Sequence, residues 1–238
     1  MQNYIFHLLF LSICIFQSVF IVLQLMLYKR KEYVYYLLYL VGISVYIFFK
    51  VNEVALILPF TISKLAYEML DQPIIIFSIW MYIRFGYFFL NLKELQPKVY
   101  RAAVRLEIGY ASLVALRIIL MPFQLTYYQA SIVFLLATVI LAIMAMQVII
   151  RLLLQKNLLN NFLVSGGLCI TLGGIFGPII ATFLPNMGEC NLLVYAGIEV
   201  GVFIEMILLN IGFLLKNKIL NQQVIKAQAK IIKQYQNK

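Results

Sequence analysis

The chain has 238 residues, of which 64% are hydrophobic and 12% are charged, and its mean hydropathy is +0.95. This composition excludes a soluble domain and predicts an integral membrane protein. The net charge is +10, but most lysines and arginines lie at alternate ends of apolar segments, which is the pattern of membrane topology. We therefore expect a lipid bilayer around the chain and no nucleic-acid partner.

Apolar segments of about the length that a membrane helix needs, roughly 20 residues, follow one another along the chain. They are predicted at residues 4–28, 33–58, 72–92, 102–121, 128–154, 162–184 and 192–215. Residues 59–71 are expected to form a loop on one side, and residues 93–101 a short loop on the other. The sequence therefore predicts an all-α membrane protein, a seven-transmembrane helix bundle over residues 1–215, with no further folded domain.

Basic residues are expected to gather at one end of this bundle. Only Lys64 falls in a loop at the opposite end, whereas the crowded end holds Lys29, Arg30, Lys31, Lys93, Lys98, Arg101, Arg105, Arg151, Lys156 and the lysines of the C-terminal tail. Because cytoplasmic loops carry an excess of Lys and Arg, we expect the N-terminus outside and the C-terminus in the cytoplasm.

Two pairs of glycines have the spacing that allows helix backbones to approach closely. Gly173 and Gly177 lie in the sixth predicted segment, and Gly197 and Gly201 lie in the seventh. Small residues four apart are typical of packed membrane helices. We interpret them as contacts within the bundle; a face between two copies is the alternative.

Ionisable side chains inside membrane segments are costly and therefore informative. At ~1.5 Å per residue, Arg84 lies ~13 Å above Lys93 and Glu205 lies ~16 Å above Lys216. These similar depths predict an ion pair between Arg84 and Glu205 within the membrane.

A second polar layer is expected nearer the outer surface, where it could line a ligand cavity open to the outside. Its members are Lys50, Glu53, Arg117 and Glu199. The alternative is that these charges form static ion pairs that fix the register of the helices.

Catalytic chemistry has few candidates in this chain. The only histidine is His7, near the outer end, where it is expected to be an interfacial residue. One histidine cannot build a zinc triad, a bis-histidine haem site or a histidine-based hydrolytic site, and no phosphate-binding glycine loop is present. We expect no cofactor, no metal and no enzymatic activity within these residues.

The polar tail, residues 216–238, has no helix breaker after the last apolar segment. Leu220, Val224, Ala227 and Ile231 follow one another at steps of four, three and four residues. This spacing predicts a cytoplasmic helical linker with a short coiled-coil seam, and hence a homodimer. The alternative is an amphipathic helix lying on the inner leaflet.

Three stretches together carry a resemblance to a known family. They are the run 84–97 from Arg84 to Pro97, the tyrosine-rich stretch 33–39, and the run 197–205 from Gly197 to Glu205 with its lysine-rich tail. The chain resembles the bacterial seven-transmembrane receptors with diverse intracellular signalling modules. This resemblance implies a sensor in the bacterial inner membrane, joined through a helical linker to an effector such as the histidine kinase of a two-component system.

The family commonly carries an outer domain and a cytoplasmic effector, and neither is visible within these residues. An unknown small-molecule or protein ligand would then be recognised by the bundle or by a partner. The rival functions are a small transporter or channel and a structural subunit of a membrane complex. A transporter should show internal symmetry between its halves, and no repeat is visible in the sequence.

Overall fold

The computed structural model describes residues 5–55, 64–120, 127–155, 157–183 and 190–236. Within these ranges the chain is helical and has no strand. The helices are α1 (Ile5–Tyr28), α2 (Lys31–Ala55), α3 (Lys64–Phe89), α4 (Leu92–Leu95), α5 (Pro97–Leu120), α6 (Tyr127–Leu153), α7 (Leu158–Phe183) and α8 (Cys190–Gln236).

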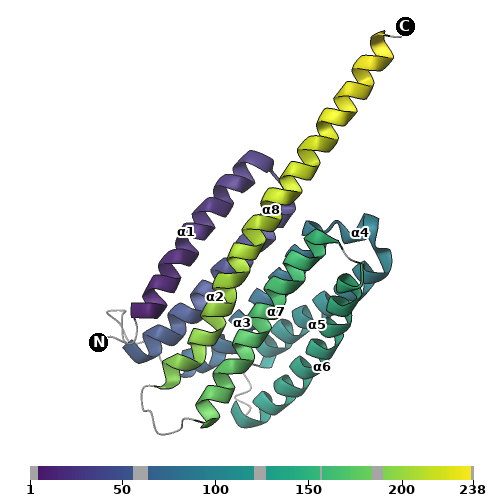
Figure 1. Ribbon diagram of the computed structural model, residues 1–238. Helices are drawn as coiled ribbons and strands as arrows, with labels where there is room; N and C mark the ends of the chain where they lie inside the picture. Colours follow the sequence, from purple (N-terminus) through teal and green to yellow (C-terminus); the bar gives the residue numbers. More distant parts are fainter. Residues whose placement is uncertain (1–4, 56–63, 121–126, 156, 184–189, 237–238) are drawn as a thin grey trace.

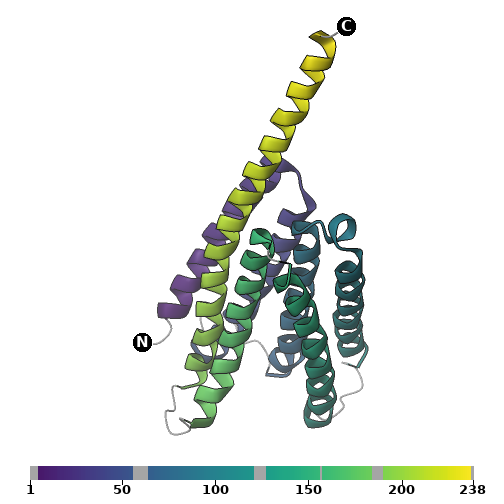
Figure 2. The same ribbon diagram turned by 45° about the vertical axis from the view of Figure 1, so that its right-hand side comes forward.

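The long helices form an up-and-down bundle (Figure 1). Consecutive long helices pack against one another. Helix α8 also contacts α1 and α2, so the last long helix lies beside the first two. The pairs α7–α8 and α2–α3 have the most extensive contacts. Figure 2 shows that α8 continues well beyond the other helices, on the side where α4 and the turn between α1 and α2 lie.

The main core forms around one face of α2. Its large buried side chains recur at alternating steps of three and four residues, as on one face of a helix: Tyr33, Tyr36, Leu40, Ile43 and Ile47. Phe85 of α3 and Phe213 of α8 pack against Tyr36, with ring centroids 5.0 and 5.7 Å away. This aromatic core ties α8 to α2 and α3.

A smaller core joins α3, α5 and α6. Its buried side chains are Ile76, Leu106, Tyr110, Leu113 and Leu141. Its described residues include none from α8. Helices α3, α5 and α6 also contribute to the main core, through Phe85, Val99 and Leu152 respectively, so all three connect the two cores. A change in one core can therefore reach the other through these three helices.

Four helices are long and apolar enough to cross a membrane, judged over the residues described. They are α1, α2 over Lys31–Asn52, α7 over Leu158–Ile175, and α8 over Tyr195–Gln236. Shorter apolar stretches occur in α3 (Pro73–Phe89) and α6 (Val139–Leu153). The prediction of an all-helical integral membrane protein agrees with these lengths.

Two predicted loops are partly helical. Helix α3 begins at Lys64, so the second half of the loop expected at residues 59–71 belongs to this helix. The loop expected at 93–101 contains most of α4 and the start of α5. Pro97 is the first residue of α5, a position where the missing N–H of proline costs nothing, and Asn91 has a left-handed φ of 50° that turns the chain between α3 and α4.

Candidate functional site

Helix α8 carries a series of polar side chains that point into the bundle, and we call these residues the polar column of α8: Glu199, Glu205, Asn210, Lys216 and Asn217. Residues eleven apart are about three helical turns apart and share a face. Glu199 and Asn210 thus face α1, whereas Glu205 and Lys216 face α2. The polar column therefore binds α8 to two neighbouring helices on two of its faces.

The outermost contact of the column is a pair between α1 and α8. His7 Nδ1 lies 2.6 Å from Glu199 Oε1, and the two side chains are 3% and 0% exposed. Glu199 Oε2 has no hydrogen-bond partner among the described residues. His7, expected as an interfacial residue, is buried in the contact between α1 and α8, because α1 turns this side chain toward α8.

A second contact between α1 and α8 is formed by two side-chain amides. Gln17 donates to Asn210 Oδ1 at 2.8 Å, and Asn210 donates back to Gln17 Oε1 at 3.2 Å. A reciprocal amide pair satisfies a donor and an acceptor of each group, and this matters because polar groups in an apolar membrane environment must find their partners within the protein. Polar contacts thus fix the position of α1 along α8 at two levels.

Glu205 occupies the middle of the column and is completely buried. The hydroxyl of Tyr36 donates to Glu205 Oε2 at 3.4 Å, whereas Glu205 Oε1 and the hydroxyl of Tyr39 have no hydrogen-bond partner in the described parts of the chain. Gly166 of α7 leaves room for this carboxyl group, because a Cβ at Gly166 would lie 3.0 Å from Glu205 Cγ. Tyrosine hydroxyls and a glycine backbone therefore surround a single buried acid.

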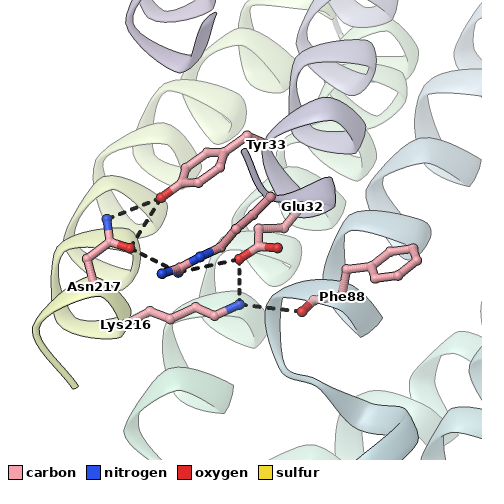
Figure 3. A network of polar contacts seen from close by, with 6 residues as sticks. Glu32, Tyr33, Phe88, Lys216 and Asn217 are labelled. Carbon is pink, nitrogen blue, oxygen red and sulfur yellow. Dashed lines mark hydrogen bonds and ion pairs between the residues drawn. The ribbon is translucent and has the colours of Figure 1, made fainter. Parts of the chain in front are cut away.

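Where α8 leaves the bundle, six residues form what we call the exit network: Arg30, Glu32, Tyr33, Phe88, Lys216 and Asn217 (Figure 3). Lys216 Nζ donates to Glu32 Oε1 at 2.7 Å and to the carbonyl oxygen of Phe88 at 3.4 Å. The side chains of Lys216 and Glu32 are each 7% exposed. Lys216, one of the basic residues expected at the cytoplasmic end of the bundle, is a buried ion-pair partner that links α8 to α2 and α3.

Asn217 extends the exit network to the start of α2. Arg30 donates to Asn217 Oδ1 at 3.2 Å, and Asn217 Nδ2 lies 3.1 Å from the hydroxyl of Tyr33. Arg30 also lies 3.9 Å from Glu32. Two adjacent residues of α8 therefore bind the turn that joins α1 to α2.

The predicted ion pair between Arg84 and Glu205 is not formed. Arg84 Nε lies 3.1 Å from Glu107 Oε1 of α5 and 3.1 Å from the hydroxyl of Tyr87, and its guanidinium stacks over Tyr35. Similar depth along the membrane does not fix the direction in which a side chain points. Arg84 is on the α5 side of α3, whereas the next residue, Phe85, packs into the core around α8.

The predicted outer cavity stays a prediction. Glu199 pairs with His7, and Lys50 lies 6.0 and 5.8 Å from the ring centroids of Tyr46 and Tyr195. The side chains of Glu53 and Arg117 lie outside the described part of the structure.

The predicted glycine contacts concern the packing of α7 against α8. A Cβ at Gly173 would overlap the carbonyl oxygen of Gly197, and a Cβ at Gly201 would lie 2.5 Å from the carbonyl oxygen of Cys169. The surroundings of Gly177 lie outside the described residues. At Gly173 and Gly201 the two backbones are too close for any side chain, as small-residue contacts between membrane helices require.

Beyond the exit network, α8 is free of the bundle. Every residue from 221 to 236 is exposed. The predicted seam residues follow this pattern, with Leu220 partly buried and Val224, Ala227 and Ile231 exposed. Exposed fractions of 55% for Val224 and 52% for Ile231 leave these apolar side chains open to a partner.

Several members of the polar column and several of its partners were not predicted from the sequence. Gln17, Asn210 and Asn217 are uncharged, and Glu32 lies at the end of an apolar segment, so neither charge nor depth in the membrane marks these four residues as site residues. The signal that could have found them is the eleven-residue spacing from Glu199 to Asn210 and from Glu205 to Lys216, which places polar groups on repeated faces of one helix.

The fold and the polar column define a helical membrane protein whose last helix is held inside the bundle and continues out of it. A family model described as 7TM diverse intracellular signalling matches residues 3–215. The chain belongs to this family of seven-transmembrane receptors. No significant match was found among curated proteins or among solved structures.

Proposed function

We propose that this membrane sensor passes a ligand- or partner-dependent shift through α8 to a cytoplasmic effector. The observation that carries the proposal is that α8 is one continuous helix of 47 residues. At ~1.5 Å per residue this helix is roughly 70 Å long. One part lies against α7, α2 and α1, and the other part is exposed.

A continuous helix transmits motion because it has no joint that would absorb it. No proline or glycine follows Gly212 in α8, so the exposed part continues directly from the exit network. A ligand switches such a helix only if it binds one arrangement of the bundle more tightly than the other, by a few kcal/mol. A shift of α8 would act on α2 and α3 through the contacts of the exit network.

We infer seven membrane spans, with α3, α5 and α6 crossing together with the four helices that meet the criteria of length and apolarity given above. The family supports this number, and the antiparallel packing of α5 between α3 and α6 agrees with it. Lys29, Lys31, Lys93 and Lys98 lie at the end from which α8 leaves, as do Arg101 and Arg105. The positive-inside rule then places the C-terminal part of α8 in the cytoplasm.

The exposed part of α8 is proposed to pair with the same part of a second copy. Its apolar side chains, at Val224 and Ile231, are exposed in the single chain and suit a coiled-coil seam. The effector proposed to follow is a histidine kinase in the bacterial inner membrane, as in the family that the sequence resembles. A parallel pair of helices would carry the shift of both bundles to it.

Cysteine crosslinking between copies tests this proposal. The chain is produced in native-like membranes with Cys14, Cys169 and Cys190 replaced by alanine, and Val224→Cys or Ile231→Cys is introduced. A short crosslinker should join two copies at either position, because seam residues of a dimer face each other.

The matched controls are Ile225→Cys and Ile232→Cys, which follow the seam residues directly and are 64% and 57% exposed. They should crosslink several-fold less efficiently. Equal crosslinking at seam and control positions, or none at either, would contradict the dimeric linker.

A further inference from the structure

An apolar groove lies between α1 and α2, on the side of the bundle that faces away from its core. Its volume is about 420 Å³, within the range of roughly 300–1,000 Å³ typical of small-molecule sites. Residues on one face of α1, among them Val19, Val22 and Leu23, form one wall, and Val41 and Val45 of α2 form the other. Both helices are long and apolar enough to cross the membrane, so the groove opens toward lipid.

Two serines line the groove, but their hydroxyl groups already donate hydrogen bonds within their own helices. The hydroxyl of Ser18 donates to the carbonyl oxygen of Cys14 at 2.8 Å, and that of Ser44 donates to the carbonyl oxygen of Leu40 at 2.7 Å. With their protons engaged by their own helices, these serines leave a nearly uniform apolar wall. The groove therefore fits a hydrocarbon chain.

The same surface leads to a cluster of positive charge. On α2, the exposed residues Lys31, Val34, Leu38, Val41 and Val45 follow one another at steps of three and four residues and share a face. On α1, Leu23 at the near end of the groove is ~9 Å from Lys29 along the helix axis. Each leaflet of the hydrocarbon core of a bilayer is roughly 15 Å thick. Because ~9 Å is less than this thickness, the groove begins within the same leaflet whose surface Lys29 and Lys31 reach.

We propose that the turn between α1 and α2 and the adjoining groove together bind one anionic phospholipid. Exposed Lys29 and Lys31 hold the phosphate headgroup, and one acyl chain lies in the groove between Val22 and Val41. Basic pockets beside membrane helices are a known mode of binding anionic lipids. Charge complementarity selects the headgroup, and the apolar groove selects a ligand that carries a chain.

The proposed site adjoins the exit network. Arg30 stands between the two lysines, and its guanidinium is turned inward to Asn217 and Glu32. The headgroup would therefore bind to the turn that also holds α8. The inference is independent of the dimer and of the effector.

Native mass spectrometry of the full chain in detergent tests the site. Delipidated protein is mixed with equal amounts of phosphatidylglycerol and phosphatidylcholine that have the same acyl chains. The unmodified chain should retain phosphatidylglycerol preferentially. The variant Lys29→Gln/Lys31→Gln should bind it about tenfold more weakly, whereas Lys93→Gln/Lys98→Gln, which removes two exposed lysines at the same end of the bundle, should bind it normally.

A second pair of variants tests the groove. Val41→Phe/Val45→Phe fills it with bulky rings and should reduce phosphatidylglycerol binding although both lysines remain. Val139→Phe/Ile143→Phe places two phenylalanines at the same spacing on exposed positions of α6 and should have no effect. All of these substitutions lie on exposed surface, and circular dichroism is expected to show unchanged helix content.

Several results would overturn the proposal. Equal retention of both lipids, or an equal effect of the two lysine pairs, would show that no specific headgroup site exists. Displacement of the lipid by glycerol phosphate, which has no acyl chain, would show that the groove plays no part. Loss of a dimer mass in Val41→Phe/Val45→Phe with unchanged lipid retention would assign the groove to a second copy.

Discussion

At the scale of single residues, polar side chains inside the bundle are joined over long distances in sequence. His7 meets Glu199, Gln17 meets Asn210, and Glu32 meets Lys216, each between the N-terminal helices and α8. Such groups are costly in an apolar bundle unless they are partnered. Each pair therefore stabilises one particular placement of α8 against α1 or α2.

The ion pair of the exit network is the first residue-scale prediction. Lys216→Met leaves the buried carboxylate of Glu32 with Arg30, at 3.9 Å, as its one remaining basic partner among the described residues. We expect the free energy of unfolding to fall by about 3 kcal/mol, because breaking a buried ion pair leaves one charge uncompensated. Unfolding of the purified chain in detergent, followed by circular dichroism, measures this loss.

The double variant Glu32→Met/Lys216→Met completes the cycle. It should be more stable than the sum of the two single losses predicts, since it leaves no unpaired charge of that pair behind. Strictly additive losses would show that the two side chains are not coupled.

The buried histidine carries the second prediction. His7→Ala removes the hydrogen-bond partner that Glu199 has among the described residues and should destabilise the chain by about 1–3 kcal/mol, the cost of an unsatisfied buried polar group. Glu199→Gln keeps a side-chain oxygen and the volume of the group, and should cost less. Comparison of the two unfolding temperatures in detergent checks this order, and the reverse order would exclude a hydrogen bond at this position as the main contribution.

At the scale of helices, the close approach of α7 to α8 depends on glycine. Gly173 and Gly174 are neighbours, yet a Cβ at Gly173 would overlap the backbone of Gly197, whereas a Cβ at Gly174 has nothing within 4 Å. The two helices can therefore pack this closely only if position 173 has no side chain, whereas position 174 has room for one.

Alanine at these two positions is the third prediction. Gly173→Ala should force α7 and α8 apart and cost about 1–3 kcal/mol, as overpacking does. Gly174→Ala, the matched control, should leave stability unchanged or raise it slightly because alanine favours helix. The readout is the unfolding temperature of each variant, and similar losses at both positions would contradict the close packing.

At the scale of the whole molecule, the bundle is polarised by what lies at its two ends. The exit network, the basic turn between α1 and α2, and the exposed part of α8 share one end. The excess of basic residues at this end predicts that it lies in the cytoplasm, which is also where the proposed signal leaves the bundle through α8.

Labelling with a membrane-impermeant maleimide tests this orientation and is the fourth prediction. With the native cysteines replaced, Asn186→Cys should react in intact cells, because the loop before α8 is expected outside. Val224→Cys should react only after the cells are permeabilised. The opposite pattern of labelling would reverse the topology.

Much of the helical architecture could be predicted from apolar segments alone. The ends of α1 and α6 lie within one residue of their predicted positions, and the prediction that the last segment runs into the tail without a break is confirmed by α8. The predicted start of α3, at residue 72, was wrong because the helix extends past the apolar stretch and begins at Lys64. Hydropathy marks where lipid is tolerated and does not mark where hydrogen bonding of the backbone ends.

The sequence by itself determined that this is a helical membrane protein of a receptor family, with polar groups along its last helix. Tertiary structure alone decided the partners of those groups. Depth along a helix can be counted at ~1.5 Å per residue, but the face that a side chain occupies depends on how each helix is rotated in the bundle. That rotation pairs Arg84 with Glu107 rather than Glu205, and turns His7 and Lys216 from surface positions into buried contacts with Glu199 and Glu32.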